Sequence, residues 1–287
     1  MTQSNSGTLV ERFFPAKLAP RGKKRLARLA LEASFFTSIA LYLTLKIGFA
    51  QPGLVSVFLI SASLSKRIQF LLDENRTTVW ETSSSNWSAN RLTALSFLSI
   101  FGGVIAAYFI YSFSVGLKDI RTTFGFAIDA SNLGDASLLT RQFSSFGRIL
   151  SNNLLVLVCI SILAFVYRAY GAMLALGWNA CVWAAAITTL TLRTAQELEI
   201  VSSYNLLIAV IALLPHLIIE GFAYILGALS AIYLSQAISK YPFSDPRFLR
   251  VTQACFMLSL IAVITVVVGS GIESTLVPYI LAKLALV

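Results

Sequence analysis

His216 and Glu220 are the two residues whose types and spacing could most readily do chemistry in this sequence of 287 residues. They stand four positions apart in the apolar segment 213–231, so on a helix they would share one face. Ionisable side chains inside a membrane are costly to bury and usually face a bundle interior or a cavity. The pair could be a structural hydrogen bond, a proton or ion path or ligand contact, or part of a metal site. The metal role is disfavoured, because His216 is the sole histidine and no HExxH pattern occurs.

A second group of polar residues also stands in or beside apolar segments. Asn152 and Asn153 precede an apolar run, and capping of its N-terminus is the simpler interpretation. Asn179 stands well inside its apolar block, away from the block's ends, and could hydrogen-bond to a neighbouring helix. Glu273 follows a glycine-rich stretch, so we expect it near a membrane interface. With Asn179, His216 and Glu220 it would form the polar pocket of a transport protein.

Backbone-breaking and small residues frame these polar ones. We expect helix breaks at Pro215, Gly171, Gly269 and Gly271, since broken helices at membrane depth often lie where function is placed. Beyond Glu220, small residues recur every four positions, which predicts a packing seam for a second helix. That seam consists of Ala223, Gly227 and Ala231.

The elements that must hold these residues are membrane helices. The chain is 57% hydrophobic and only 12% charged, with a mean hydropathy of +0.78, whereas soluble domains have about 25% charged residues. We therefore predict an all-α, polytopic transmembrane bundle of six to seven segments, some broken or re-entrant. The apolar blocks are 29–50, 53–64, 92–117, 149–192, 204–235 and 251–287.

Two of these blocks depart from the length of one crossing, which is about 20 residues. Block 53–64 is short and spans the bilayer only if Lys66 and Arg67 snorkel and the helix continues toward Leu72. Block 149–192 is long enough for two elements, with the break between Arg168 and Gly171. The segment 118–148 between blocks contains turn formers, and we expect a surface loop there.

The net charge of +9 is concentrated at the N-terminus, where seven basic residues precede the first apolar block. Such a cluster is typical of a topology signal that contacts anionic lipid headgroups, rather than of nucleic-acid binding. The positive-inside rule then places the N-terminus in the cytoplasm and the chain in the inner membrane. These basic residues are Arg12, Lys17, Arg21, Lys23, Lys24, Arg25 and Arg28.

No familiar enzyme pattern is present in the sequence. There is no GxSxG, Walker A, CxxC or EF-hand motif, so we expect no enzyme, no catalytic residue and no cofactor. The three cysteines, Cys159, Cys181 and Cys255, lie inside apolar blocks and are predicted to be buried free thiols.

The order of these residues resembles the stage II sporulation protein M family of integral membrane proteins. The resemblance rests on Asn152-Asn153, Gly171, Asn179, Pro215-His216 with Glu220, Gly227, and Ile272-Glu273 with Pro278. It covers 92–287, leaving 1–28 as a basic cytoplasmic segment and 29–91 as an N-terminal membrane hairpin and polar loop. The family often has Gly where this chain has Ala180 and Leu217. The resemblance implies a membrane scaffold that recruits envelope enzymes, while relatives accompany bacteriocin maturation, export or immunity.

Two functions follow as hypotheses. The leading one is a non-enzymatic scaffold or subunit of an envelope complex, which assembles with itself or with other membrane proteins through the small-residue seam. The alternative is a transporter or channel for an ion or small solute, built around the intramembrane polar residues.

Overall fold

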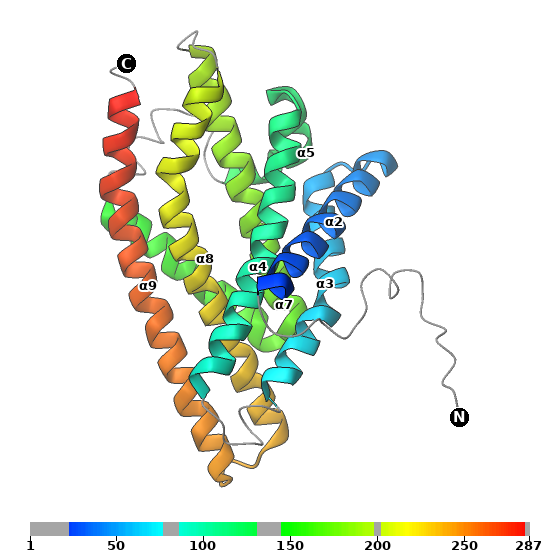
Figure 1. The fold of residues 1–287 in the computed structure, drawn as a ribbon, viewed down its shortest axis with the longest axis vertical. Coiled ribbons are helices and arrows are strands. Elements are labelled where there is room, and N and C mark those ends of the chain that lie inside the picture. The colour runs from blue at the N-terminus through cyan, green and yellow to red at the C-terminus, as the bar shows by residue number, and fades with distance from the viewer. Residues whose placement is uncertain (1–22, 77–85, 131–144, 198–201, 285–287) are drawn as a thin grey trace.

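The computed structural model describes residues 23–76, 86–130, 145–197 and 202–284, and these residues form seven helices. Figure 1 shows the long helices side by side, with the C-terminus at one end of the bundle. In the described part of the chain there is no strand, so the all-α prediction is confirmed. The helices are α2 (Lys23–Ile47), α3 (Pro52–Arg76), α4 (Asn86–Ser114), α5 (Leu117–Ala130), α7 (Phe146–Glu197), α8 (Ser202–Lys240) and α9 (Pro246–Leu284).

Six of these helices are long and apolar enough to cross a membrane. They include α3, so the short apolar block at 53–64 extends into a helix of 25 residues that suits one crossing. The protein is therefore a multi-pass membrane protein. The candidate spans are Lys24–Ile47, Pro52–Arg76, Asn90–Ser114, Phe146–Thr189, Leu214–Lys240 and Pro246–Leu276.

Helices α2 and α3 form an antiparallel hairpin. The turn between them contains Gly48 at a φ of +80°, a left-handed conformation that glycine adopts without steric cost. Two ion pairs join the helices at matching positions. Arg25 bonds Glu74, and seven residues further along α2, Glu32 bonds Arg67, seven residues back along α3.

The hairpin packs directly on α4 and shares its core with the rest of the bundle. A Cβ atom on Gly103 of α4 would lie 2.2 Å from the backbone oxygen of Ala30, so the two helix backbones are in close contact there. Ser34 donates a hydrogen bond of 2.7 Å to the carbonyl of Gly103. Helix α2 runs obliquely to α4 (Figure 1).

The loop expected at 118–148 is wrong over its first part, because α5 occupies residues 117–130. The helix buries a stripe formed by Ile120, Phe124 and Ala127, which follow helical spacing. That apolar stripe packs against α7, which accounts for a helix where a loop is expected. The turn formers, Ser131, Asn132 and Gly134, lie outside the described residues.

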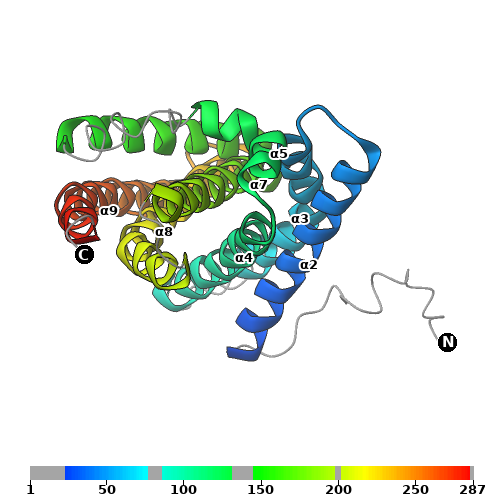
Figure 2. The ribbon, with the colours of Figure 1, turned by 90° about the horizontal axis from the view of Figure 1, so that it is seen from above.

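Helix α7 changes direction at Arg168, inside the interval where the sequence predicts a break. Arg168 has a φ of 51° and a ψ of −127°, while the residues on both sides are helical. The first leg (146–167) and the second leg (169–197) run in different directions (Figure 2). Gly171 permits the bend, because a Cβ atom there would lie 2.0 Å from the carbonyl oxygen of Leu163.

The other predicted breaks are wrong. Helix α8 continues through Pro215, and α9 continues through Gly269 and Gly271. Proline removes one backbone donor but does not force a helix to end when the flanking apolar segments stay packed. Gly269 instead lets α9 approach α8, since its Cβ position lies 3.3 Å from Ile219 and 3.5 Å from the side chain of Glu220.

Candidate functional site

Three helices bring polar side chains together inside the bundle: the first leg of α7, α8 and α9. Asn153 of α7 donates a hydrogen bond from Nδ2 to Oε1 of Glu220 on α8. The same amide nitrogen lies 3.4 Å from the hydroxyl oxygen of Ser270 on α9. All three side chains are buried. The contact is possible because the first leg of α7 crosses α8 and α9, which also pack against each other (Figure 1).

Glu273 completes this cluster. It stands three residues after Ser270 on the same face of α9, and its carboxyl group lies close enough to Glu220 and Asn153 to interact with both. An ionised carboxylate only accepts hydrogen bonds, so a bond between two carboxyl groups requires a proton on one of them. Glu273 therefore belongs to the main site, and because it stands three residues before the end of the candidate span of α9, its expected place near an interface stays a prediction. Its three-residue spacing from Ser270 turns it toward Glu220.

The two carboxyl groups have no basic partner in the part of the chain that the structure describes. The ion pairs of the described residues lie elsewhere, in the α2–α3 hairpin and near the helix ends. The aromatic side chain of Tyr224, one turn after Glu220, is also buried. The surroundings thus offer hydrogen bonds to the acids but no compensating positive charge.

His216 does not pair with Glu220. Both side chains are buried, as the sequence suggests, but Glu220 turns to Asn153 and Glu273 instead. The Nδ1 atom of His216 is buried without a hydrogen-bond partner among the described residues. A shared helix face allows contact between residues four apart but does not require it, because side chains on neighbouring helices compete for the same acceptor.

The remaining polar candidates lie apart from the cluster. Asn152 is exposed, and its contact to Asn153 is long, at 3.5 Å. Asn179 donates to the carbonyl of Ala175 in its own helix at 2.8 Å, so it makes no bond across helices there. The capping role of Asn152 and Asn153 is also wrong, because α7 begins at Phe146, well before either residue.

The predicted small-residue seam is used inside the chain. Ala223, Gly227 and Ala231 are all buried. A Cβ atom on Gly227 would lie 2.5 Å from Leu157 and 3.3 Å from Ser161, both on the first leg of α7. The seam therefore holds the leg that carries Asn153 against α8.

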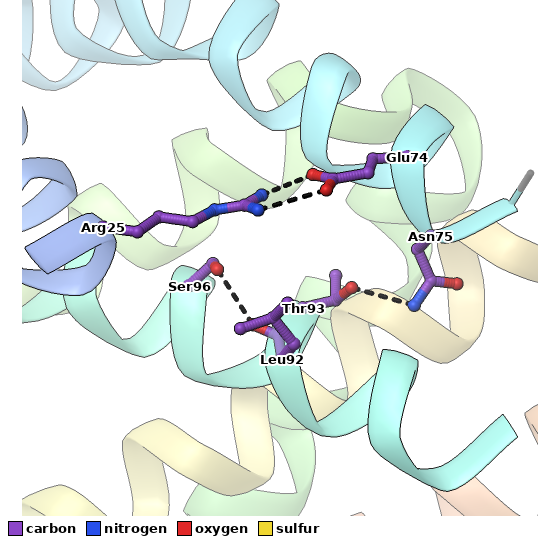
Figure 3. Close-up of polar contacts among 6 residues, drawn as sticks. All are labelled: Arg25, Glu74, Asn75, Leu92, Thr93 and Ser96. Atoms are coloured by element: carbon purple, nitrogen blue, oxygen red, sulfur yellow. Dashed lines mark hydrogen bonds and ion pairs between the residues drawn. The ribbon is translucent and has the colours of Figure 1, made fainter. Parts of the chain in front are cut away.

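A second set of buried charges lies in the α2–α3 hairpin. Arg67 donates from Nε and Nη2 to Glu32 at 2.9 and 2.8 Å, and both side chains are buried. Arg25 donates to both oxygens of Glu74 at 3.1 and 2.5 Å (Figure 3). A carboxylate on the neighbouring helix accepts two bonds from each guanidinium, so both arginines are paired inside the bundle rather than directed away from it.

These pairs are absent from the sequence-based candidates, although a signal for them exists. Each helix carries one of the acids and one of the arginines, seven residues apart. Seven residues are two helical turns, so the two side chains share one face. Asn75, beside Glu74, extends the polar contacts to α4, because its amide donates a hydrogen bond of 2.8 Å to the hydroxyl of Thr93 (Figure 3).

The described residues contain no group of three or more His, Cys, Asp or Glu side chains arranged to hold a metal ion. Two of the three cysteines, Cys181 and Cys255, are buried free thiols, but Cys159 is exposed on the first leg of α7, contrary to prediction. It faces outward from an apolar helix, where the surroundings in a membrane are lipid.

Comparisons with protein-family models, with curated proteins and with solved structures found no match. The resemblance to the stage II sporulation protein M family therefore stays a prediction.

Proposed function

We propose that this protein transports a proton or a small cation across the membrane, with Glu220 and Glu273 as the exchange site. The observation that carries the proposal is the meeting of two acids from different helices without a basic partner in the described residues. A structural role would be served by a neutralised pair, as in the α2–α3 hairpin. Unneutralised acids inside a membrane are typical of proton relays and ion pathways.

The chemistry of the site supports exchange. With one proton between them, the two carboxyl groups can hydrogen-bond to each other. When that proton leaves, two adjacent negative charges remain in a medium that solvates them poorly, and a cation can replace the proton. The carboxyl oxygens of Glu220 and Glu273 and the hydroxyl oxygen of Ser270 are of the kind that hard cations prefer.

The scaffold hypothesis stays a prediction, but its structural motivation is reduced. At Gly227 the seam packs against Leu157 within the chain, so that part of it is not free to bind a second copy. Purification in mild detergent tests the scaffold function: a stable homo-oligomer or a retained membrane partner would favour it.

The orientation also belongs to this proposal. The α3 C-terminus and the α8–α9 turn lie at the same end of the bundle (Figure 1). Arg76, Lys240, Arg247 and Arg250 stand at or near this end, which the positive-inside rule assigns to the cytoplasm of an inner membrane. A Cys introduced at the exposed Phe243 would be labelled from the cytoplasmic side only.

Flux through reconstituted liposomes tests the transport function. A pH gradient with Na⁺ or K⁺ on the opposite side should drive proton movement that a trapped pH-sensitive dye reports. Glu220→Gln and Glu273→Gln should each abolish this flux while the protein still elutes as a folded species. Asp119→Asn is the matched control, because Asp119 is an exposed acid on α5. Wild-type flux retained in both Gln variants would contradict the proposal.

A further inference from the structure

A cavity of about 400 Å³ lies between the first leg of α7, α8 and α9. Its floor is made of small residues, Gly227, Ala231 and Ala262, which are buried. The large side chains at its edge are exposed on the outside of the membrane-spanning helices, and in a bilayer they face hydrocarbon. These are Val158, Ile162, Phe165 and Val263.

The hydroxyl groups that line the cavity are already satisfied by the protein. Ser161 donates to the carbonyl of Leu157 at 2.8 Å. Ser230 donates to the carbonyl of Cys255 at 2.8 Å and is also paired with the hydroxyl of Ser259 at 2.8 Å. The cavity therefore has no polar group that requires a polar ligand, and the remaining lining is apolar.

We propose that this cavity binds one acyl chain of a bilayer phospholipid. The edge residues place the opening at the lipid-facing surface, where hydrocarbon chains are the most abundant apolar molecules. A helix of a second copy does not fit, because one turn of a helix about 10 Å across and 5.4 Å long already fills roughly 400 Å³. A slender, flexible chain can fill the same volume along its length, and it gains contacts with the cavity walls that an empty cavity lacks.

The test measures thermal unfolding of delipidated full-length protein in detergent. Long-chain phosphatidylcholine should raise the unfolding midpoint of the wild type, since a ligand bound only to the folded state stabilises it. Short-chain phosphatidylcholine with the same headgroup should not. Ala231→Phe, which fills the floor, should lose the shift. Gly102→Phe is the control, because Gly102 is exposed on α4 with nothing within 4 Å of its Cβ position.

A second measurement keeps the proposal testable if Ala231→Phe fails to fold. A phospholipid with a photoreactive group at mid-chain, added to the wild type in bilayers, should label 157–165 and 227–234 above the exposed residues of α2. An equal midpoint shift in Ala231→Phe and wild type, a shift with the short-chain lipid, or labelling spread evenly over α2 and α7 would each overturn the proposal.

Discussion

The α2–α3 hairpin and the α7–α8–α9 cluster both bury acids within apolar helices, and they treat those acids differently. In the hairpin, Glu32 meets the guanidinium of Arg67 at 2.8 Å. In the cluster, Glu220 meets the amide of Asn153 and a second acid, Glu273. The first arrangement neutralises charge within the fold, whereas the second leaves the balance of charge to a proton or a cation.

The difference separates buried charges that stabilise a membrane protein from buried charges that can gain or lose a proton. A buried ion pair is fixed, because removal of either partner leaves an uncompensated charge. Two acids in contact can change their protonation without loss of a salt bridge. Buried polar residues in a membrane sequence are therefore best judged by their partners rather than by their depth.

The largest effect should come from breaking a neutralised pair. Arg67→Met leaves the carboxylate of Glu32 buried alone and should lower the free energy of unfolding by about 3–5 kcal/mol. Adding Glu32→Leu should recover most of this loss, since the double variant removes both charges. Denaturant titration in detergent micelles measures both variants. A double variant as unstable as Arg67→Met would show that packing, and not charge, explains the loss.

A smaller effect should follow at the contact between the hairpin and α4. Gly103→Ala places a Cβ atom against the backbone of Ala30 and should cost about 1–3 kcal/mol, because backbone atoms cannot move aside as a flexible side chain can. The neighbouring Gly102→Ala has open space and should be neutral or stabilising by up to about 1 kcal/mol. The same unfolding assay compares the two. Equal losses would mean that α2 and α4 are further apart than described.

The acid pair should tolerate neutralisation. Glu273→Gln keeps the size and the hydrogen-bonding capacity of the side chain, and it removes no salt bridge in the described residues. We expect the free energy of unfolding at neutral pH to change by less than about 1 kcal/mol, well below the Arg67→Met loss. A loss as large as that of Arg67→Met would place the acids among the structural charges and remove the contrast between the two regions.

The sequence predicts the helical fold and part of the site. Blocks of apolar residues are sufficient for the helices, and the excess length of 149–192 predicts the change of direction at Arg168. Asn153 and Glu220 are recognisable as buried polar residues. Their contact is not, because it joins residues far apart in the chain and depends on how the first leg of α7 packs against α8.

The errors share one physical cause, which is that local signals omit the neighbouring helix. Gly269 resembles a break in the sequence but serves as a point of close approach to Glu220. From the sequence, Arg25 is predicted to contact lipid headgroups, but in the fold Glu74 of α3 lies opposite and pairs with it. Residues 117–130 form a helix rather than the start of a loop because α7 packs against their apolar stripe.

The smallest effect concerns a charge pair outside the membrane, at the α8–α9 turn. Asp245 caps α9 by accepting the backbone N–H of Arg247 at 2.8 Å, and it also accepts bonds from the Arg247 guanidinium. These bonds lower the pKa of the Asp245 carboxyl below its ordinary value of 3.8.

A lowered pKa means that the folded state favours the ionised carboxylate of Asp245. Its contribution to stability is thus complete above pH 3.8 and is lost as the pH falls through the lowered pKa. Carbon-13 NMR of labelled aspartate should find this titration below 3.8 in the wild type and nearer the ordinary value in Arg247→Met. Arg247 is exposed and water screens the pair, so Asp245→Asn, which keeps the cap, should change stability far less than Arg67→Met. A comparable loss would mean that partnering alone, without burial, is enough to make a charge structural.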